Sequence, residues 1–430
     1  MIINHTITIQ HAHINNIYLS HKISSTTGSR IFNLALLAAP LSVLIPAAYL
    51  SGSESKMTDY TWDYALWSVE KAGPTFIKLI QWATTRHDLF HPEFISRFTA
   101  LQDHTRGHTW KETEKLLEDA LGPNYHDILA FDDDELNDGE HQNEYQKQKR
   151  LSNANGGWFP WSSSNRDKYV PIGSGCVAQV YKAKLKQDVK LLPTGTEVAV
   201  KVTHPNILHK VCVDFYILNT ITSLLELLPN IDYLSMKDSV GQFRDIMLPQ
   251  LDLRVEANNL KRFRRDFEND PQVAFPMPVD DLTSANVLVE SFIHGETILN
   301  FCGEGKRTIK ERQHLATIGL ETVMKMIFLY DFVHGDLHPG NILVNRNKSE
   351  KGHPLRLNMI DCGLVVEMGE QDHVNLVKVL GAFIKKDGFL AANLMIDTAK
   401  KCQASALDVE LFCKGIQKIC TDDAEQVSLV

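Results

Sequence analysis

The stretch His334-Gly335-Asp336-Leu337-His338-Pro339-Gly340-Asn341 decides the fold class of this chain. It places an aspartate five positions before an asparagine, downstream of the apolar run 327–330. Another aspartate, Asp361, follows the mostly apolar run 357–360. In protein kinases, residues of these types hold Mg²⁺ and orient the group that accepts a phosphoryl group. The spacing therefore predicts a phosphoryl-transfer site, in which Asp336 orients or deprotonates an acceptor while Asn341 and Asp361 bind Mg²⁺.

A second set of residues, between positions 173 and 292, suits a nucleotide. The segment 173–180 predicts a glycine loop between strands, whose backbone N–H groups cover phosphates. Lys201, in a strand-like Ala-Val-Lys run, is expected to pair with the α- and β-phosphates, and Glu256 to hold that lysine in place. The residues expected to contact ATP are Gly173, Ser174, Gly175, Cys176, Ala178, Val180, Lys201, Glu290 and Phe292.

Several departures argue against a conventional protein kinase. The third glycine of the loop is replaced by Ala178. Asp361 is followed by Cys362-Gly363, without the usual phenylalanine, and no Ala-Pro-Glu triplet follows. We therefore expect no conventional activation segment and no platform for peptide substrates.

Composition sets the outer limits on function. Hydrophobic and charged contents of 43% and 23% are ordinary for a globular protein. The net charge of −9 argues against nucleic acid as the main partner. The seven cysteines contain no C-x-x-C pair and the 18 histidines no H-E-x-x-H spacing. We predict reduced thiols in a non-secreted protein and no histidine metal site.

The N-terminus carries targeting information. It has no Asp or Glu before Glu54 and is rich in Ser and Thr, which indicates a mitochondrial targeting segment. Residues 31–50 are uncharged and would span about 30 Å as a helix, so we predict a membrane helix, with a buried or cleaved segment as the alternative. The predicted divisions are a targeting segment (1–30), a transmembrane helix (31–50), a helical extension (57–131), a polar insertion (132–166), an N-lobe (167–295) and a C-lobe (296–430).

Together these residues resemble the aarF-domain-containing, UbiB-like atypical kinase family, and within it the branch called aarF-domain-containing kinase 2. The motifs that carry the resemblance are 73–82, 175–181, 200–205, 251–258 and 334–344. The resemblance implies an α+β, bilobal protein-kinase-like fold with an N-terminal helical extension. It also implies ATP and Mg²⁺ as cofactors, a mitochondrial membrane location, a membrane lipid or quinone-like ligand, and coenzyme Q biosynthetic proteins as partners.

The resemblance further implies a regulatory clamp. The family carries a Lys-x-Gly-Gln motif that folds over the nucleotide site, which Lys78 and Gln81 match, although Ile80 replaces the glycine. The family's Glu-x-Asp motif reads Gln250-Leu-Asp252 here, so Lys78 loses its ion-pair partner and we expect a weaker clamp. We also expect one helix over 248–267, with Asp252 and Glu256 on the same face. The chain ends 69 residues after Asp361, which predicts a short C-lobe.

The leading hypothesis is a membrane-anchored mitochondrial ATPase or atypical kinase that supports coenzyme Q or lipid metabolism. One alternative is a catalytically weak, nucleotide-gated scaffold for lipid or biosynthetic enzymes. The other is a small-molecule phosphotransferase, since antibiotic and choline kinases use a similar His-Gly-Asp loop.

Overall fold

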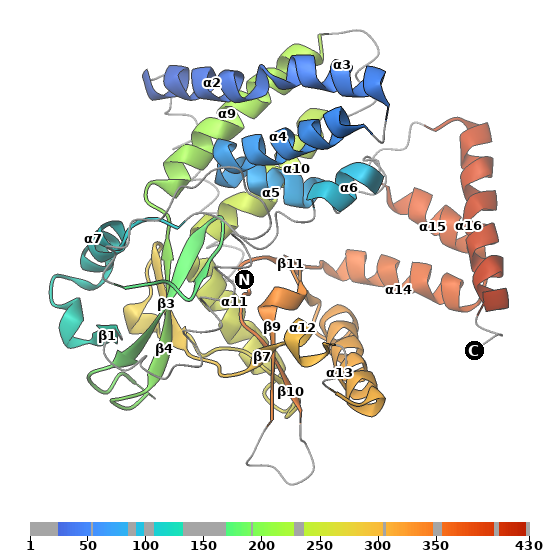
Figure 1. Cartoon of the computed structure of the whole chain (residues 1–430). Coiled ribbons are helices and arrows are strands. Elements are labelled where there is room, and N and C mark those ends of the chain that lie inside the picture. The colour runs from blue at the N-terminus through green and yellow to red at the C-terminus, as the bar shows by residue number, and fades with distance from the viewer. Residues whose placement is uncertain are drawn as a thin grey trace. The chain divides into compact units, whose positions relative to one another are not determined.

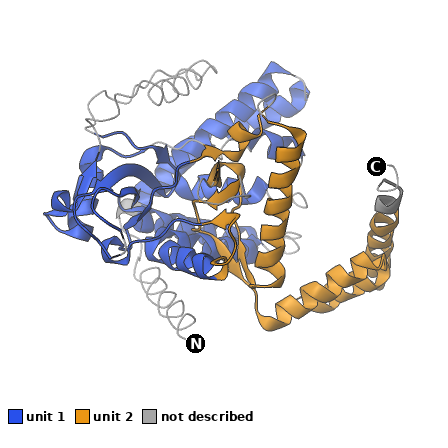
Figure 2. Ribbon diagram, turned by 90° about the horizontal axis from the view of Figure 1, so that it is seen from below, with its two compact units in different colours: residues 1–265, 275–294 blue, residues 266–274, 295–430 orange. Residues whose placement is uncertain are grey.

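The computed structural model contains two units of mixed helix and strand, as the predicted α+β class requires. It describes residues 25–52, 55–84, 92–98, 107–131, 169–190, 192–227, 236–303, 307–346, 355–399 and 404–426. The predicted insertion and most of the targeting segment lie outside these residues. Unit 1 comprises residues 1–265 and 275–294, and unit 2 comprises 266–274 and 295–430 (Figure 2). Residues 266–274, predicted as N-lobe, belong to unit 2 because β5 (Val273–Ala274) pairs with β10 (Arg356–Met359).

The sheet of unit 1 runs in the order β1-β3-β4-β6, with β2 beside β3. Its antiparallel strands are β1 (Leu129–Phe131), β2 (Gly173–Ser174), β3 (Ala178–Leu185), β4 (Glu197–Thr203) and β6 (Val287–Ser291). Along β3 the side chains of Gln179, Tyr181, Ala183 and Leu185 are buried, and those between them are half-buried from Val180 onward. This alternation places one face of the sheet in the core; the opposite face, called here the open face, is half-buried along β3 and packs against α11 (Leu253–Asp266) through Glu256.

Helix α7 (Trp110–Leu121) covers the core face of this sheet. A capping box between Thr109 and Glu112 begins the helix. The Trp110 ring lies 5.0 Å from that of Phe131 and 5.1 Å from that of Tyr181. Figure 1 shows α7 and α11 (Leu253–Asp266) on opposite sides of β3 and β4.

The prediction that the helical extension continues to residue 131 is wrong, since residues 129–131 form the strand β1. Leu129 pairs with Leu185 and Phe131 with Ala183, and both side chains are buried in the core that α7 covers. A short apolar run can form either a helix or a strand, and pairing with β3 decides it here.

A layer of helices completes unit 1. They are α2 (Ser25–Ala38), α3 (Leu41–Ser51), α4 (Lys56–Ala72), α5 (Pro74–Thr84), α6 (Pro92–Phe98), α9 (Ile207–Leu225) and α10 (Met236–Met247). The segment Thr27–Ser51, with a mean hydropathy of 2.0, is long and apolar enough to cross a membrane by length and composition. It lies along α4, whose Tyr64 and Thr61 hydroxyls donate to the carbonyls of Leu37 and Leu44 at 3.2 and 3.4 Å.

Arg30 fixes the start of this apolar segment to the rest of unit 1. Its Nε and Nη2 donate to Oδ1 and Oδ2 of Asp214 on α9, at 2.7 and 2.9 Å. The Thr75 hydroxyl donates to the same carboxylate at 2.7 Å. Asp214 is fully buried, so its charge depends on these partners. Residues 25–30, which the sequence analysis assigns to a targeting segment, are therefore part of the folded unit.

Unit 2 carries a sheet in the order β5-β10-β9-β7 and the two-stranded pair β8–β11. The remaining strands are β7 (Glu296–Thr297), β8 (Phe332–His334), β9 (Ile342–Asn345) and β11 (Val365–Glu367), and the helices are α12 (Ile298–Phe301), α13 (Ile309–Phe328), α14 (Glu370–Ile384), α15 (Gly388–Thr398) and α16 (Ala406–Gln426). β9 and β10 pair antiparallel, so the chain between Asn341 and Asp361 forms a hairpin.

Candidate functional site

Lys201 and Glu256 form the ion pair that the sequence predicts. Lys201 lies on β4 and Glu256 on α11, and Nζ lies 2.8 Å from each carboxylate oxygen. The side chains are only 15% and 4% exposed. Glu256 can reach the lysine because it lies on the buried side of α11. The pair fixes the rotamer of Lys201, whereas its contact with phosphates stays a prediction.

Four predicted nucleotide residues share the open face of the sheet. Val180 is the cross-strand neighbour of Lys201, and Ala178 follows two positions away on the same face of β3. Glu290 of β6 is on this face too, opposite Ala199. Phe292 lies just beyond β6, where its ring contacts the ammonium of Lys182 at 4.9 Å. The strand register therefore brings together residues that are up to 112 positions apart.

The predicted glycine loop is the tight hairpin between β2 and β3. Gly173 pairs with Val180 and Ser174 with Gln179, and the Gly175 N–H donates to the Ala178 carbonyl at 2.9 Å. His204, a residue that the sequence did not single out, holds the tip of this loop. The His204 N–H donates to the Val177 carbonyl and its Nε2 donates to the Gly175 carbonyl, both at 2.8 Å. Its position directly after β4, the strand that carries Lys201, is the feature of the sequence that could have indicated this role.

In unit 2, His334 connects the two predicted aspartates. The Asp336 N–H donates to its Nδ1 at 3.2 Å, so the neutral ring carries its proton on Nε2, which donates to the Asp361 carbonyl. Burial lowers the pKa of His334, which favours this neutral form. His334 thus braces the backbone at both residues.

Asn341 belongs to the same hydrogen-bonded loop. Its Nδ2 donates to the Asp336 carbonyl at 3.4 Å, and its own carbonyl accepts the Ile360 N–H at 3.1 Å. Gly335 lets β8 approach the strand after Asp361, because a Cβ there would lie 2.9 Å from Cγ of Leu364. These contacts hold Asp336, Asn341 and Asp361 within one loop system of unit 2.

This loop system offers oxygen atoms of the kind that Mg²⁺ prefers. They are the carboxylate of Asp361, which also accepts the Gly363 N–H at 3.0 Å, and the amide oxygen of Asn341. Among the described residues, no three His, Cys, Asp or Glu side chains are grouped so that they could hold a metal ion. Asn341 and Asp361 offer oxygen ligands of the kind that Mg²⁺ takes together with phosphates and water, and their binding of Mg²⁺ stays a prediction.

The predicted regulatory residues lie on two neighbouring elements of unit 1. Lys78 and Gln81 are on α5, which packs through Leu79 and Trp82 against the apolar cluster of α9, α10 and residues 248–251. Gln250 lies in the short 3₁₀ turn that residues 248–251 form, and its Nε2 donates to the Ile246 carbonyl at 2.9 Å. Their regulatory role stays a prediction.

The single helix predicted over 248–267 is wrong. Residues 248–251 form a 3₁₀ turn containing Pro249, Asp252 has extended backbone angles, and α11 begins at Leu253. The Asp252 carboxylate accepts the Arg254 N–H at 3.0 Å and also binds the Arg254 guanidinium. This local hydrogen bond competes with helix formation, so Asp252 does not share a helix face with Glu256.

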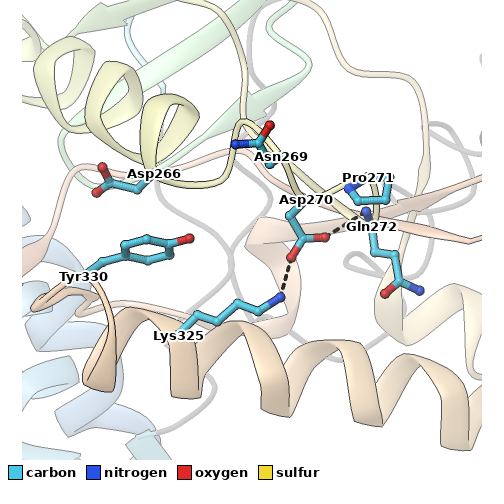
Figure 3. Close-up of a pocket in the computed structure, with 7 residues that line it drawn as sticks. All are labelled: Asp266, Asn269, Asp270, Pro271, Gln272, Lys325 and Tyr330. Carbon is cyan, nitrogen blue, oxygen red and sulfur yellow. Dashed lines mark hydrogen bonds and ion pairs between the residues drawn. The ribbon is translucent and has the colours of Figure 1, made fainter.

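Unit 2 also contains a cavity of about 300 Å³ that includes none of the predicted residues (Figure 3). Its lining residues are Asp266, Asn269, Asp270, Pro271, Gln272, Lys325 and Tyr330. The Lys325 Nζ lies 2.7 Å from Asp270, and this hydrogen bond raises the pKa of Lys325. The polar lining lacks the apolar walls of most ligand pockets, so we assign it no role.

Comparison with known proteins decides the family. Residues 138–395 match the ABC1 atypical kinase-like domain. The chain belongs to this family. It is 26% identical to the mitochondrial ABC1 family protein YPL109C of Saccharomyces cerevisiae, over 91% of this chain and 63% of that protein. It is 30% identical to the probable serine/threonine-protein kinase abkC of Dictyostelium discoideum, over 75% of this chain and 40% of that protein.

Two further matches come from bacteria. The probable protein kinase UbiB of Glaesserella parasuis is 28% identical over 82% of this chain and 57% of its own length. The solved complex of Rv3197 with erythromycin from Mycobacterium tuberculosis aligns with a TM-score of 0.47 at 20% identity, over 80% of this chain and 71% of that one. The chain spans 40 to 63% of the length of the first three curated relatives. The family match confirms the predicted aarF and UbiB-like family and kinase-like fold, while the branch stays a prediction.

Proposed function

We propose that this ABC1-family chain is an ATP- and Mg²⁺-dependent atypical kinase or ATPase. The observation that carries the proposal is the brace at His334, which binds the backbone of both Asp336 and Asp361. Asn341 joins the same loop through the Asp336 carbonyl. Three residues of the types that phosphoryl transfer uses are thus held in one hydrogen-bonded loop system. The buried Lys201–Glu256 pair of unit 1 adds support.

Each residue has a distinct role in this proposal. Lys201, oriented by Glu256, neutralises nucleotide phosphates, and the glycine loop covers them with backbone N–H groups. Asn341 and Asp361 hold Mg²⁺, which when bound neutralises charge on the phosphate oxygens. Asp336 orients a hydroxyl or a water and accepts its proton.

For the cellular setting we propose a mitochondrial membrane and a role in coenzyme Q or lipid metabolism, with a lipid or quinone-like molecule as ligand. The mitochondrial ABC1 proteins of two yeasts support the location. The apolar helix Thr27–Ser51 supports attachment to a membrane. Its N-terminal end is held by Arg30 and its length lies along α4, so attachment must preserve both contacts.

The test measures Mg-ATP turnover and nucleotide binding separately. Asp336→Asn should lower turnover by about 10²–10⁴-fold while leaving binding unchanged, because it removes only the proton acceptor. Asp361→Ala should abolish Mg²⁺-dependent binding, and with it the stabilisation of about 2.7 kcal/mol expected from nucleotide at 100 times its dissociation constant. Asp397→Asn, on the exposed side of α15, is the matched control and should change neither quantity.

The outcomes separate the rival functions. Wild-type turnover by Asp336→Asn would refute the proposed role. Binding by the wild-type chain without any turnover would favour a nucleotide-gated scaffold, which Ala178 in place of a loop glycine also suits. Phosphate transfer to a soluble alcohol would favour a small-molecule phosphotransferase. All assays need the whole chain, because α7 and β1 contribute to the core of unit 1.

A further inference from the structure

A chain of hydrogen bonds connects the glycine loop to the segment before α7. The Gly175 carbonyl contacts Nε2 of His204 at 2.8 Å, and Nδ1 of His204 lies 2.8 Å from Nδ1 of His108. Nε2 of His108 lies 2.9 Å from the Thr113 hydroxyl, which is itself 2.9 Å from the Tyr181 hydroxyl. Four successive contacts thus run from a buried tyrosine of β3, through α7, to the loop tip.

The chemistry of the partners fixes the direction of this chain. A carbonyl can only accept, so Nε2 of His204 carries a proton and, in the neutral ring, its Nδ1 accepts. His108 must then donate from Nδ1, and its Nε2 accepts from the Thr113 hydroxyl. The Tyr181 hydroxyl donates to Thr113. Every donor has an acceptor, and the neutral pair has only this one arrangement that satisfies all four contacts.

Gln179 clamps the same segment to the strand that follows the loop. Its Oε1 accepts the His108 N–H at 3.1 Å, and its Nε2 donates to the His108 carbonyl at 3.2 Å. Gln179 is fully buried. A Cβ at position 107 would lie 2.5 Å from Oε1 of Gln179, so only glycine permits this approach. The segment before α7 is therefore docked on β3 as well as on His204.

These groups act from behind the sheet. Gln179 and Tyr181 project onto the core face of β3, whereas Val180, between them, shares the open face with Lys201. The two histidines therefore need no contact with a nucleotide. They can act on it only by fixing the backbone of the loop tip, through the Gly175 carbonyl.

We propose that His108 and His204 are positioning residues, which hold the glycine loop in its phosphate-covering conformation and couple it to the segment before α7. The proposal rests on the proposed function, because it takes the loop to be the cover of the nucleotide phosphates. Through this pair, any displacement of residues 107–109 is transmitted to the loop tip.

Burial favours the neutral form of the pair near pH 7. Burial lowers the pKa of His108 to about 4 and also lowers that of His204. The charged groups that face the rings oppose one another, since Lys210 of α9 disfavours protonation and Glu112 of α7 favours it. One proton added to His204 would put a hydrogen on both facing Nδ1 atoms, because neutral His108 already carries one there, and would break the chain.

The experiment compares substitutions that retain different hydrogen bonds of the His108–His204 pair. A glutamine amide nitrogen reaches the position of Nε2, and an asparagine amide nitrogen that of Nδ1. His204→Gln thus retains the donor to Gly175, whereas His204→Asn loses it. His108→Gln retains the contact with Thr113 but loses the one with His204. His126→Gln, in the 3₁₀ turn after α7, is the control.

The readouts are hydrogen exchange of amides 174–178 without nucleotide and the dissociation constant of Mg-ATP. We expect His204→Asn to exchange fastest in this loop and to bind about 3- to 10-fold more weakly, the effect of one lost hydrogen bond. His204→Gln and His108→Gln should each give a smaller loss of affinity for Mg-ATP. Their combination should lose no more than either alone, because both remove the same Nδ1–Nδ1 contact.

Each unexpected result has a distinct meaning. Unchanged loop exchange in all variants would overturn the positioning role, whatever the affinities are. Faster exchange with unchanged affinity would overturn its importance for nucleotide. Losses that multiply in the double variant would show that the histidines act independently. If the wild-type chain did not bind Mg-ATP, the proposed function would fail, while the exchange rates would still decide whether the pair holds the loop.

Discussion

Replacing Glu256 by glutamine should destabilise unit 1 and weaken nucleotide binding for the same reason, because Lys201 loses its charge partner. The Lys201 and Glu256 side chains are 15% and 4% exposed, and both carboxylate oxygens lie 2.8 Å from Nζ. Breaking a buried pair by removing one partner costs about 3–5 kcal/mol, since the remaining buried charge loses the compensation that this partner gave it. We expect Glu256→Gln to lower the free energy of unfolding by about 3 kcal/mol. This value is the low end of that range, because Lys201 keeps some contact with water.

A double-mutant cycle tests this cause. The variant Lys201→Met/Glu256→Gln carries neither charge, so it should regain most of the stability that Glu256→Gln loses. It should not regain nucleotide affinity, because the ammonium group is absent. The matched control is Glu197→Gln, which breaks the Lys182–Glu197 pair of the same sheet. Those side chains are 23% and 27% exposed, so the control should cost about 1 kcal/mol or less.

Urea denaturation followed by tryptophan fluorescence is the suitable assay. The four tryptophans in the part of the chain that the structure describes, at positions 62, 67, 82 and 110, all lie in unit 1, so their signal reports the unit that contains the pair. The reasoning would be refuted if the double variant were as unstable as the two single losses added together. It would also be refuted if the double variant regained nucleotide affinity along with stability.

Two further predictions concern buried polar groups of unit 1. Arg30→Met should lower the free energy of unfolding by about 3–5 kcal/mol, because the fully buried Asp214 loses its cation. The control Arg97→Met, at an exposed pair, should lower it by about 1 kcal/mol or less. Equal losses in urea denaturation would contradict the buried pairing. Since the pKa of His108 is lowered from 6.5 to about 4, only the unfolded chain takes up a proton there as the pH falls through this range. The free energy of unfolding should therefore decline from about pH 6.5 towards 4, and His108→Gln should make that decline shallower when both are measured by denaturation across this range.

The parts of the site that sequence could predict are those with local signals. The loop 334–341 combines a proline–glycine turn with flanking apolar strands, so its residue types restrict one another over eight positions. Lys201 lies in a β-branched run that reads as a strand at any register. The β9–β10 hairpin follows from two such runs separated by a polar segment. In each case neighbours in sequence are also neighbours in space.

The features that sequence did not predict depend on partners far away along the chain. His108 and His204 are 96 positions apart, and Arg30 and Asp214 are 184 apart. Single histidines and arginines are common on protein surfaces, so nothing in the residue type indicates that these side chains have distant partners. The prediction of a helix across Asp252 was wrong for the opposite reason. The local hydrogen bond from the Arg254 N–H to the Asp252 carboxylate outweighed the helical pattern around it.

These distant contacts change how the N-terminal part of the chain relates to the kinase-like domain. The sequence suggests a lobe beginning at residue 167, preceded by separable helices. Yet Arg30 compensates a buried charge on α9, and His108 and Trp110 contact β3 or the residue after β4. A fragment beginning at 167 would expose the apolar core face of the sheet and leave Asp214 without its cation. The described segments that carry Arg30, His108 and Trp110 therefore form part of unit 1 itself, so a change in residues 107–110 can alter the glycine loop without touching a nucleotide.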